Sequence, residues 1–184
     1  MQIESNQLIE DLLSRTEGAS KAVRKFRELS MDQLHFKRSA EEWSILECIE
    51  HLNLYGDYYL VEIEKQILAQ KSKTKSTTFK SGLIGNYFAN LMLVKNGKLT
   101  RMKSPKDKNP SHSKLTITTI DRFLKQQERL KSLLIQARSI DLTKTKTAIS
   151  LTKYITLRLG DTFRFFIYHI ERHIIQAERV LENK

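Results

Sequence analysis

The chain has 184 residues with six Gly, two Pro and one Cys, a composition that suits one domain of long helices and excludes an internal disulfide framework. Its formal net charge is +11, and most of it falls in residues 71–114, which hold eleven Lys or Arg and one acid. No apolar run approaches the roughly 18 residues of a membrane-spanning helix, and the N-terminus lacks the pattern of a signal peptide. We therefore expect a single domain over residues 1–184, a cytoplasmic location and no membrane partner.

The first predicted helix runs from Ser5 to about Leu29. Its apolar residues recur every three or four positions, which places them on one side of a helix. This buried stripe comprises Ile9, Leu12, Ala19, Val23 and Phe26. The residues from Ser30 to Leu34 break the pattern and predict a short turn.

The second long helix has a clear start signal. Ser44 and Glu47 fit a capping box, in which each side chain accepts a hydrogen bond from the other residue's backbone N–H. The helix is predicted to continue to about Ala69, with His51 at the edge of its core stripe. That stripe comprises Ile45, Ile49, Leu52, Tyr59 and Ile63.

The connection that follows is long and basic. Residues 71–80 and 95–113 are predicted loops, and residues 83–94 form a short extra helix between them. A basic loop can attract nucleic acid, anionic lipid or a small anion. No nucleic-acid motif accompanies this one, so we favour a solvated loop first, an anionic small-molecule substrate second and nucleic acid last.

The third long helix is predicted to begin near Thr118 or Thr119 and to end near Ile140. Residues 141–160 are rich in Thr and Lys, which indicates an extended loop or a short hairpin. The last helix spans 161–181, with Asp161 or Thr162 as its cap. Four long amphipathic helices predict an all-α four-helix bundle, and the long basic loop between helices two and three allows those two helices to run parallel.

Two histidines on the last helix indicate a candidate metal site. His169 and His173 are four residues apart, so both imidazoles point to the same side of the helix. The zinc-protease signature needs a Glu directly after the first His, and Ile170 occupies that position. Such a pair can also be ordinary hydrogen-bonded core residues, and the spacing alone leaves both readings open. By the helical rise, His51 can reach the level of this pair from a facing helix.

Trp43-Ser44 is followed seven residues on by His51-Leu52. This pattern resembles the second-helix signature of the DinB/YfiT-like metalloenzymes, and it is the strongest part of the likeness. The stretch from Leu159 through His173 resembles its last helix. A weaker middle pattern matches at Phe79-Lys80, Leu83, Gly85, Pro105 and Pro110.

The resemblance implies an up-down-down-up four-helix bundle that holds a divalent metal through His51, His169 and His173. Zn, Ni, Fe and Mn are not distinguished by this donor set. The resemblance further implies a metal-dependent transferase or isomerase that uses a low-molecular-weight thiol and acts on small molecules, which the basic loop suggests are anionic. A non-catalytic ligand- or partner-binding module with the same pocket is the alternative. A homodimer is also expected.

Several neighbouring residues receive more modest predictions. Cys48 could be a fourth ligand or a nucleophile, although a small buried apolar role is favoured. Trp43 is predicted to pack at the start of its helix, and Glu47 is a candidate acceptor for the His51 ring. Gln176 could support His173 or simply lie at the edge of the bundle. Arg172 is expected to point away from the ligands and to form an ion pair at the surface or between helices. His35 and His112 are expected to lie on the surface.

Overall fold

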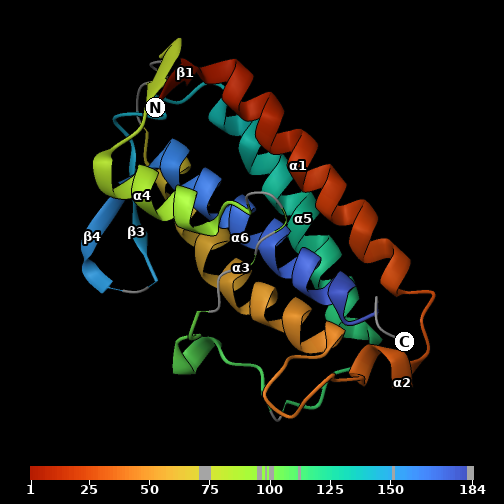
Figure 1. The fold of residues 1–184 in the computed structure, drawn as a ribbon. Helices are drawn as coiled ribbons and strands as arrows, with labels where there is room; N and C mark the ends of the chain where they lie inside the picture. The colour runs from red at the N-terminus through yellow and green to blue at the C-terminus, as the bar shows by residue number, and fades with distance from the viewer. Residues whose placement is uncertain are drawn as a thin grey trace.

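The computed structural model describes residues 1–70, 76–94, 97, 99, 102–111, 113–150 and 152–181. These residues are mostly helical (Figure 1). The four long helices are α1 (Ser5–Phe26), α3 (Ile45–Leu68), α5 (Ile117–Ala137) and α6 (Leu159–Arg179). The shorter ones are α2 (Met31–His35), α4 (Leu83–Met92) and a 3₁₀ turn, η1 (Lys106–Lys108).

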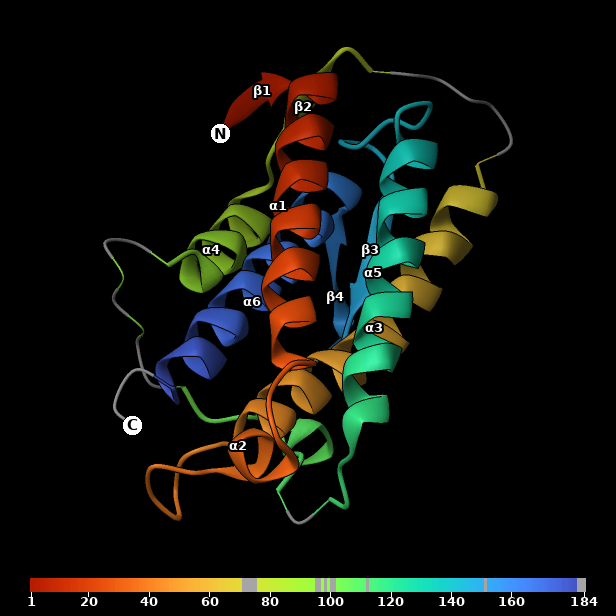
Figure 2. The same cartoon turned by 90° about the vertical axis from the view of Figure 1, so that its right-hand side faces the viewer.

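The long helices pack around a shared core. Both α1 and α3 contact α5 and α6, and α4 lies along α6. In Figures 1 and 2, α1 and α6 run in one direction while α3 and α5 run in the other. The predicted parallel arrangement of the helices on either side of the basic connection is therefore present. One apolar cluster extends through the helices from Leu8 to Val180 and includes the whole stripe predicted for α1.

The prediction of a short turn at Ser30–Leu34 is wrong. This stretch forms α2, whose start is a second capping box: Ser30 accepts from the Gln33 backbone, and the Gln33 side chain accepts from Ser30. Leu34 is fully buried and anchors the helix to the core. The three-residue spacing of Ser30 and Gln33 therefore allows a capping box that starts a helix, although the apolar pattern is interrupted there.

Two small antiparallel sheets accompany the helices, so the fold is mostly helical and not purely so. Strand β1 (Gln2–Glu4) pairs with β2 (Thr78–Lys80), where a loop was predicted. The Phe79 ring of β2 is fully buried and lies against Gly160 of α6, so one apolar side chain anchors this otherwise polar, basic stretch. Strands β3 (Lys146–Ile149) and β4 (Thr152–Arg158) form the hairpin that was one of two predicted options.

One predicted helix start needs correction, and the start of α5 at Ile117 lies within a residue or two of the prediction. Strand β4 leads directly into α6, whose N-cap is Arg158, so Asp161 lies within the first turn and is not the cap. Helix α5 is capped by Thr116, which accepts a hydrogen bond from the Thr118 backbone. Among the described residues, none of the helices is both long and apolar enough to cross a membrane.

Candidate metal centre

Helices α3 and α6 bring the three predicted histidines together. His51 lies in the second turn of α3, and His169 and His173 lie on the facing side of α6. One ring nitrogen from each residue lies within 4.8 Å of the other two, and the ring centroids are 4.5, 4.6 and 5.1 Å apart. This cluster could hold a metal ion. It forms because α3 and α6 run antiparallel and place His51 at the level of the pair.

Hydrogen bonds fix the orientation of two rings. The Nδ1–H of His51 donates to the backbone oxygen of Lys108 at 2.6 Å. The Nδ1–H of His173 donates to Oε1 of Gln176 at 2.9 Å. Since a carbonyl oxygen can only accept, each of these rings keeps the lone pair on Nε2. Second partners of this kind are what metal-ligating histidines generally have.

The third ring has no such partner among the described residues. The Nδ1 atom of His169 is buried and makes no hydrogen bond to them, whereas its Nε2 atom lies 3.2 Å from Nε2 of His51. Two Nε2 atoms can face each other without a metal only if one carries the proton. A cation between the two lone pairs removes this requirement, so the convergence of the three imidazoles fits a cation. The buried Nδ1 atom of His169 has no partner among the described residues in either arrangement, so it does not distinguish them.

The three imidazoles are neutral at pH 7. Burial lowers the pKa of His51 to about 4. Burial also lowers the pKa values of His169 and His173 well below the ordinary value, and the neighbouring imidazoles lower them further. Because a metal binds the deprotonated ring, these low pKa values keep the donors available.

The centre lies in a cleft of about 820 Å³. Aromatic rings stand close to the histidines: the Trp43 ring is 4.7 Å from that of His51, and the Tyr55 ring is 4.5 Å from that of His169. The Phe165 ring stacks on His169 at 6.0 Å. Trp43 therefore does more than pack at the start of α3. Its contact with the His51 ring depends on the folded chain and does not follow from helical spacing, although Trp43 belongs to the sequence pattern that carries the family likeness.

The basic connection also reaches the cleft. Met102, Lys103 and Ser104 line it, and Lys108 supplies the carbonyl that orients His51. The predicted partner for His51, Glu47, is wrong, because its carboxylate caps α3 and pairs with Lys37 at 2.7 Å. A local motif could not indicate Lys108, which is far from His51 in sequence.

The predicted surface position of Arg172, pointing away from the ligands, is also wrong. This residue is only 7% exposed and lines the cleft. Three residues correspond to about 300° of helical rotation, so Arg172 lies only about 60° from His169 around α6. Simple rotation arithmetic would have placed it beside the ligand stripe.

The remaining sequence predictions divide as follows. Cys48 is fully buried, and burial raises the pKa of its thiol, which fits the favoured apolar role. Gln176 takes the supporting role beside His173. His35 is exposed, as expected, and its ring contacts the Met31 and Leu115 carbonyls. His112 lies outside the described residues.

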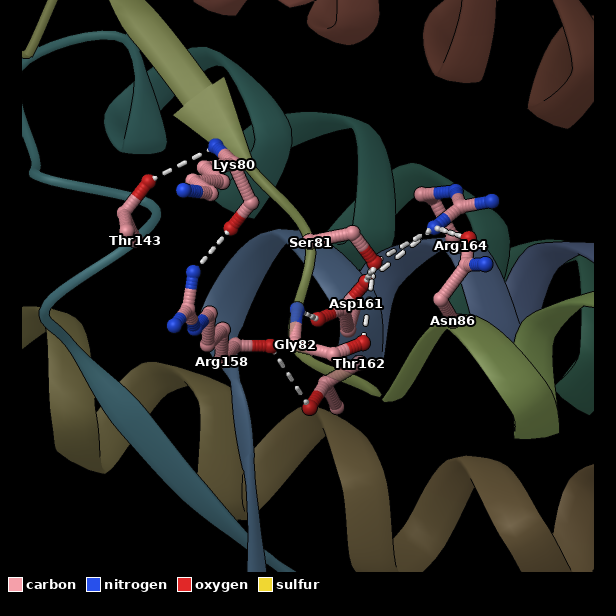
Figure 3. A network of polar contacts seen from close by, with 9 residues as sticks. All are labelled: Lys80, Ser81, Gly82, Asn86, Thr143, Arg158, Asp161, Thr162 and Arg164. Atoms are coloured by element: carbon pink, nitrogen blue, oxygen red, sulfur yellow. Dashed lines mark hydrogen bonds and ion pairs between the residues drawn. The ribbon is translucent and has the colours of Figure 1, made fainter. Parts of the chain in front are cut away.

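A second buried polar cluster fixes α4 against the start of α6 (Figure 3). The Asp161 carboxylate accepts from the Gly82 backbone at 2.8 Å and from the Ser81 hydroxyl, and it pairs with Arg164 at 3.1 Å. Arg164 also donates to Asn86 at 3.2 Å. A Cβ atom on Gly85 would lie only 2.5 Å from the Asp161 side chain, so the α4 backbone approaches α6 closely. This cluster holds one wall of the cleft in place.

The fold and the centre together define a mostly helical protein with three convergent histidines in a cleft. The sequence model of the DinB superfamily matches residues 13–177, and the chain belongs to that superfamily. Comparisons with curated proteins and with solved structures found no match.

Proposed function

We propose that this protein binds one divalent metal ion through His51, His169 and His173 and uses it to transfer a small thiol to a small-molecule substrate. The observation that carries the proposal is the convergence of three neutral imidazoles, each with a ring nitrogen within 4.8 Å of the other two. The proposal also takes the four long helices as an up-down-down-up four-helix bundle.

The donor set supports a first-row divalent ion, for which imidazole is a good ligand. When bound by three neutral ligands, such an ion keeps its +2 charge and can lower the pKa of a thiol at an open position. Two neighbouring residues fix the tautomers of the ligand rings. Lys108 and Gln176 hold the ring protons of His51 and His173 on Nδ1, and so present both Nε2 lone pairs to the centre.

The aromatic rings contribute by excluding water. Trp43, Tyr55 and Phe165 pack against the imidazoles, and the resulting burial keeps the rings neutral. Low local polarity also strengthens any charge interaction inside the cleft.

Metal content tests the first half of the proposal. Purified protein would be loaded with zinc, dialysed and measured for metal-to-protein ratio, together with single His→Ala variants. Wild type should retain one ion, and His51→Ala, His169→Ala and His173→Ala should each lose most of it. His35→Ala is the matched control, because this exposed ring lies outside the cluster. Equal retention by His51→Ala and His35→Ala would contradict the site.

A conjugation assay tests the second half. Metal-loaded protein would be incubated with an electrophile and each of several low-molecular-weight thiols, and the thioether product quantified. We expect a rate above background that disappears in His169→Ala. Protein that holds metal at the three histidines and conjugates none of these thiols would instead support the non-catalytic binding module.

A further inference from the structure

Helix α4 exposes an apolar face to solvent. The helix packs on α6 at the outside of the bundle, and its ten residues include no charged side chain, although 29% of the chain is charged (Figures 1 and 2). Gly85 and Ala89 are on its buried side, whereas Leu83 is 93% exposed, Tyr87 64% and Ile84 53%. The three exposed side chains fall within about 100° of one another around the helix axis, so they form one face. We call Leu83, Ile84 and Tyr87 the apolar face of α4.

The fold holds this face outward. The Asp161 carboxylate accepts a hydrogen bond from the Gly82 backbone at 2.8 Å, just before α4 begins. A Cβ atom on Gly85 would lie only 2.5 Å from the Asp161 side chain, so α4 meets α6 through this glycine. Turning the helix would bring a larger side chain into the same contact. The apolar face therefore stays in solvent, and adjoining exposed apolar side chains of this kind mark an interaction surface.

Four cations lie beside the start of α4. The Arg158 side chain comes within 3.5 Å of the place where a Cβ atom on Gly82 would be, and its guanidinium donates to the backbone oxygen of Lys80 (Figure 3). Lys146 stands directly opposite Arg158 in the β3–β4 pair, so the two side chains leave the same face of the hairpin. Lys144 comes two residues before Lys146. We call Lys80, Lys144, Lys146 and Arg158 the basic corner.

The basic corner keeps its positive charge. The Lys80 backbone N–H donates to the Thr143 hydroxyl at 3.0 Å, which brings the loop that contains Lys144 beside Lys80. Lys80, Lys144 and Lys146 are exposed and form no ion pair within the described part of the chain. Asp141 lies in the same loop, and its carboxylate accepts from the backbone N–H groups of Thr143 and Lys144. The corner therefore has a net positive charge next to an apolar helix face.

An anionic lipid surface matches both features. Interfacial helices bury an apolar face at the headgroup boundary, and nearby Lys and Arg side chains attract anionic lipids. A second copy of the chain would bring its own basic corner to the same interface, where like charges repel. Nucleic acid would engage the cations and leave the apolar face in water. We propose that α4 and the basic corner dock this protein on the surface of an anionic bilayer, with Leu83, Ile84 and Tyr87 in the headgroup boundary.

This docking is peripheral, and it departs from the expectation of no membrane partner, which came from the lack of a spanning segment. Phe88, Leu91 and Met92, on the neighbouring side of α4, line the cleft of the three histidines. Docking through α4 would therefore bring the cleft close to the bilayer. The inference does not rest on the proposed function, because the docking surface includes none of the three histidines.

Vesicle flotation tests the docking. The full chain would be mixed with vesicles of phosphatidylcholine alone, or with about one third phosphatidylglycerol, at low salt and at about 0.15 M salt. We expect binding to the anionic vesicles that weakens with salt, and at least about tenfold weaker binding to phosphatidylcholine alone. Wild-type protein that stays unbound with anionic vesicles at low salt would overturn the proposal.

Leu83→Asn tests the apolar face. Because Leu83 is almost fully exposed, this change should leave the circular dichroism spectrum and the metal content as in wild type. It should weaken vesicle binding about tenfold, since a leucine no longer enters the headgroup boundary. Leu68→Asn is the matched control, at a 73% exposed position on α3, and should bind like wild type. Unchanged vesicle binding in Leu83→Asn would refute the docking face.

A double variant tests the basic corner. Lys144→Gln combined with Lys146→Gln should weaken binding to anionic vesicles by about fivefold for each lysine removed. Lys21→Gln combined with Lys125→Gln removes the same charge from exposed positions on α1 and α5, and should have a much smaller effect. Equal losses in the two double variants would show attraction by net charge alone and would refute the corner as the lipid site.

Two other occupants would give different results. If a second copy covers the apolar face, sedimentation should show a wild-type dimer that Leu83→Asn converts to a monomer. If nucleic acid occupies the corner, duplex DNA should bind at about 0.15 M salt and lose affinity in the variant of Lys144 and Lys146, but not in Leu83→Asn. Either result without vesicle binding would refute the bilayer as the partner. Metal content measured in the same samples keeps this outcome separate from that of the three-histidine site.

Discussion

Helix α6 carries two buried polar clusters that differ in one decisive respect. Near its start, Asp161 and Arg164 pair opposite charges, and Ser81, Gly82 and Asn86 satisfy them further (Figure 3). Two turns later, His169 and His173 bring like groups together with His51, and all three are neutral rings that can donate a lone pair to a metal. Each cluster has one buried nitrogen without a partner among the described residues, on Arg164 and on His169, so this feature does not separate them. The first cluster therefore stabilises the fold, while the second is prepared for a cation that the chain does not itself supply.

The largest effect is expected when one charge is removed from the Asp161–Arg164 cluster, which tests whether that cluster stabilises the fold. Asp161→Asn leaves Arg164 buried without its carboxylate, which should cost about 3–5 kcal/mol in the free energy of unfolding. Denaturant unfolding measures this loss. Asp11→Asn is the control, because its ion pair with Arg15 lies at the surface and should contribute less than about 1 kcal/mol. Equal effects would mean that the Asp161 cluster is not structural.

Acid should destabilise the metal-free protein through the second cluster. The pKa of His51 is about 4 in the folded chain and near 6.5 when unfolded. The unfolded state therefore binds more protons between these values, so stability is complete above pH 6.5 and falls as the pH drops toward 4. For His51 alone the loss is roughly 3 kcal/mol. Urea unfolding across this range measures it.

The matching variant for the acid experiment is His51→Gln, which cannot titrate there. Its stability should vary less with pH than that of wild type, since one of the three low-pKa imidazoles is gone. Identical pH profiles for the two proteins would show that His51 is not held neutral by burial.

Gln176 should matter for metal affinity more than for folding. Its side-chain oxygen accepts the Nδ1–H of His173 at 2.9 Å, so Gln176→Leu removes the group that orients this ring. Loss of such a partner typically lowers metal affinity by about 10–100-fold. Competition with a chelator of known affinity gives the number. Gln136→Leu, at an exposed position on α5, should leave the affinity unchanged.

Metal removal should have the smallest effect on structure. The apolar core extends through all the long helices and does not depend on the centre. A chain of this length can bury enough apolar surface to fold alone, unlike a zinc finger. Far-UV circular dichroism should therefore be nearly unchanged after chelation. Extensive loss of helicity would show that the fold depends on metal at the three histidines. The contrast with the Asp161–Arg164 cluster would then disappear.

The features that the sequence predicts well are those that one segment encodes by itself. The apolar spacing of α1, the capping box at Ser44 and the four-residue spacing of His169 and His173 all follow from helical geometry. The family resemblance then joined His51 to this pair, which helical spacing alone left open.

Features that join distant segments were not predictable in this way. The pairing of Gln2–Glu4 with Thr78–Lys80 depends on where Phe79 is buried. The Lys108 carbonyl reaches His51 only because the basic connection folds over the cleft. Arg172 is different, because the rotation of a single helix already placed it near His169.

The most direct test of the central claim is X-ray absorption spectroscopy of the zinc-loaded protein, which counts and identifies the atoms bound to the ion. The account predicts three imidazole nitrogens at about 2.0–2.1 Å, with any further ligand an oxygen or nitrogen. A spectrum with a protein sulfur at about 2.3 Å, assigned to Cys48 by its loss in Cys48→Ala, or with fewer than three imidazoles, would contradict it.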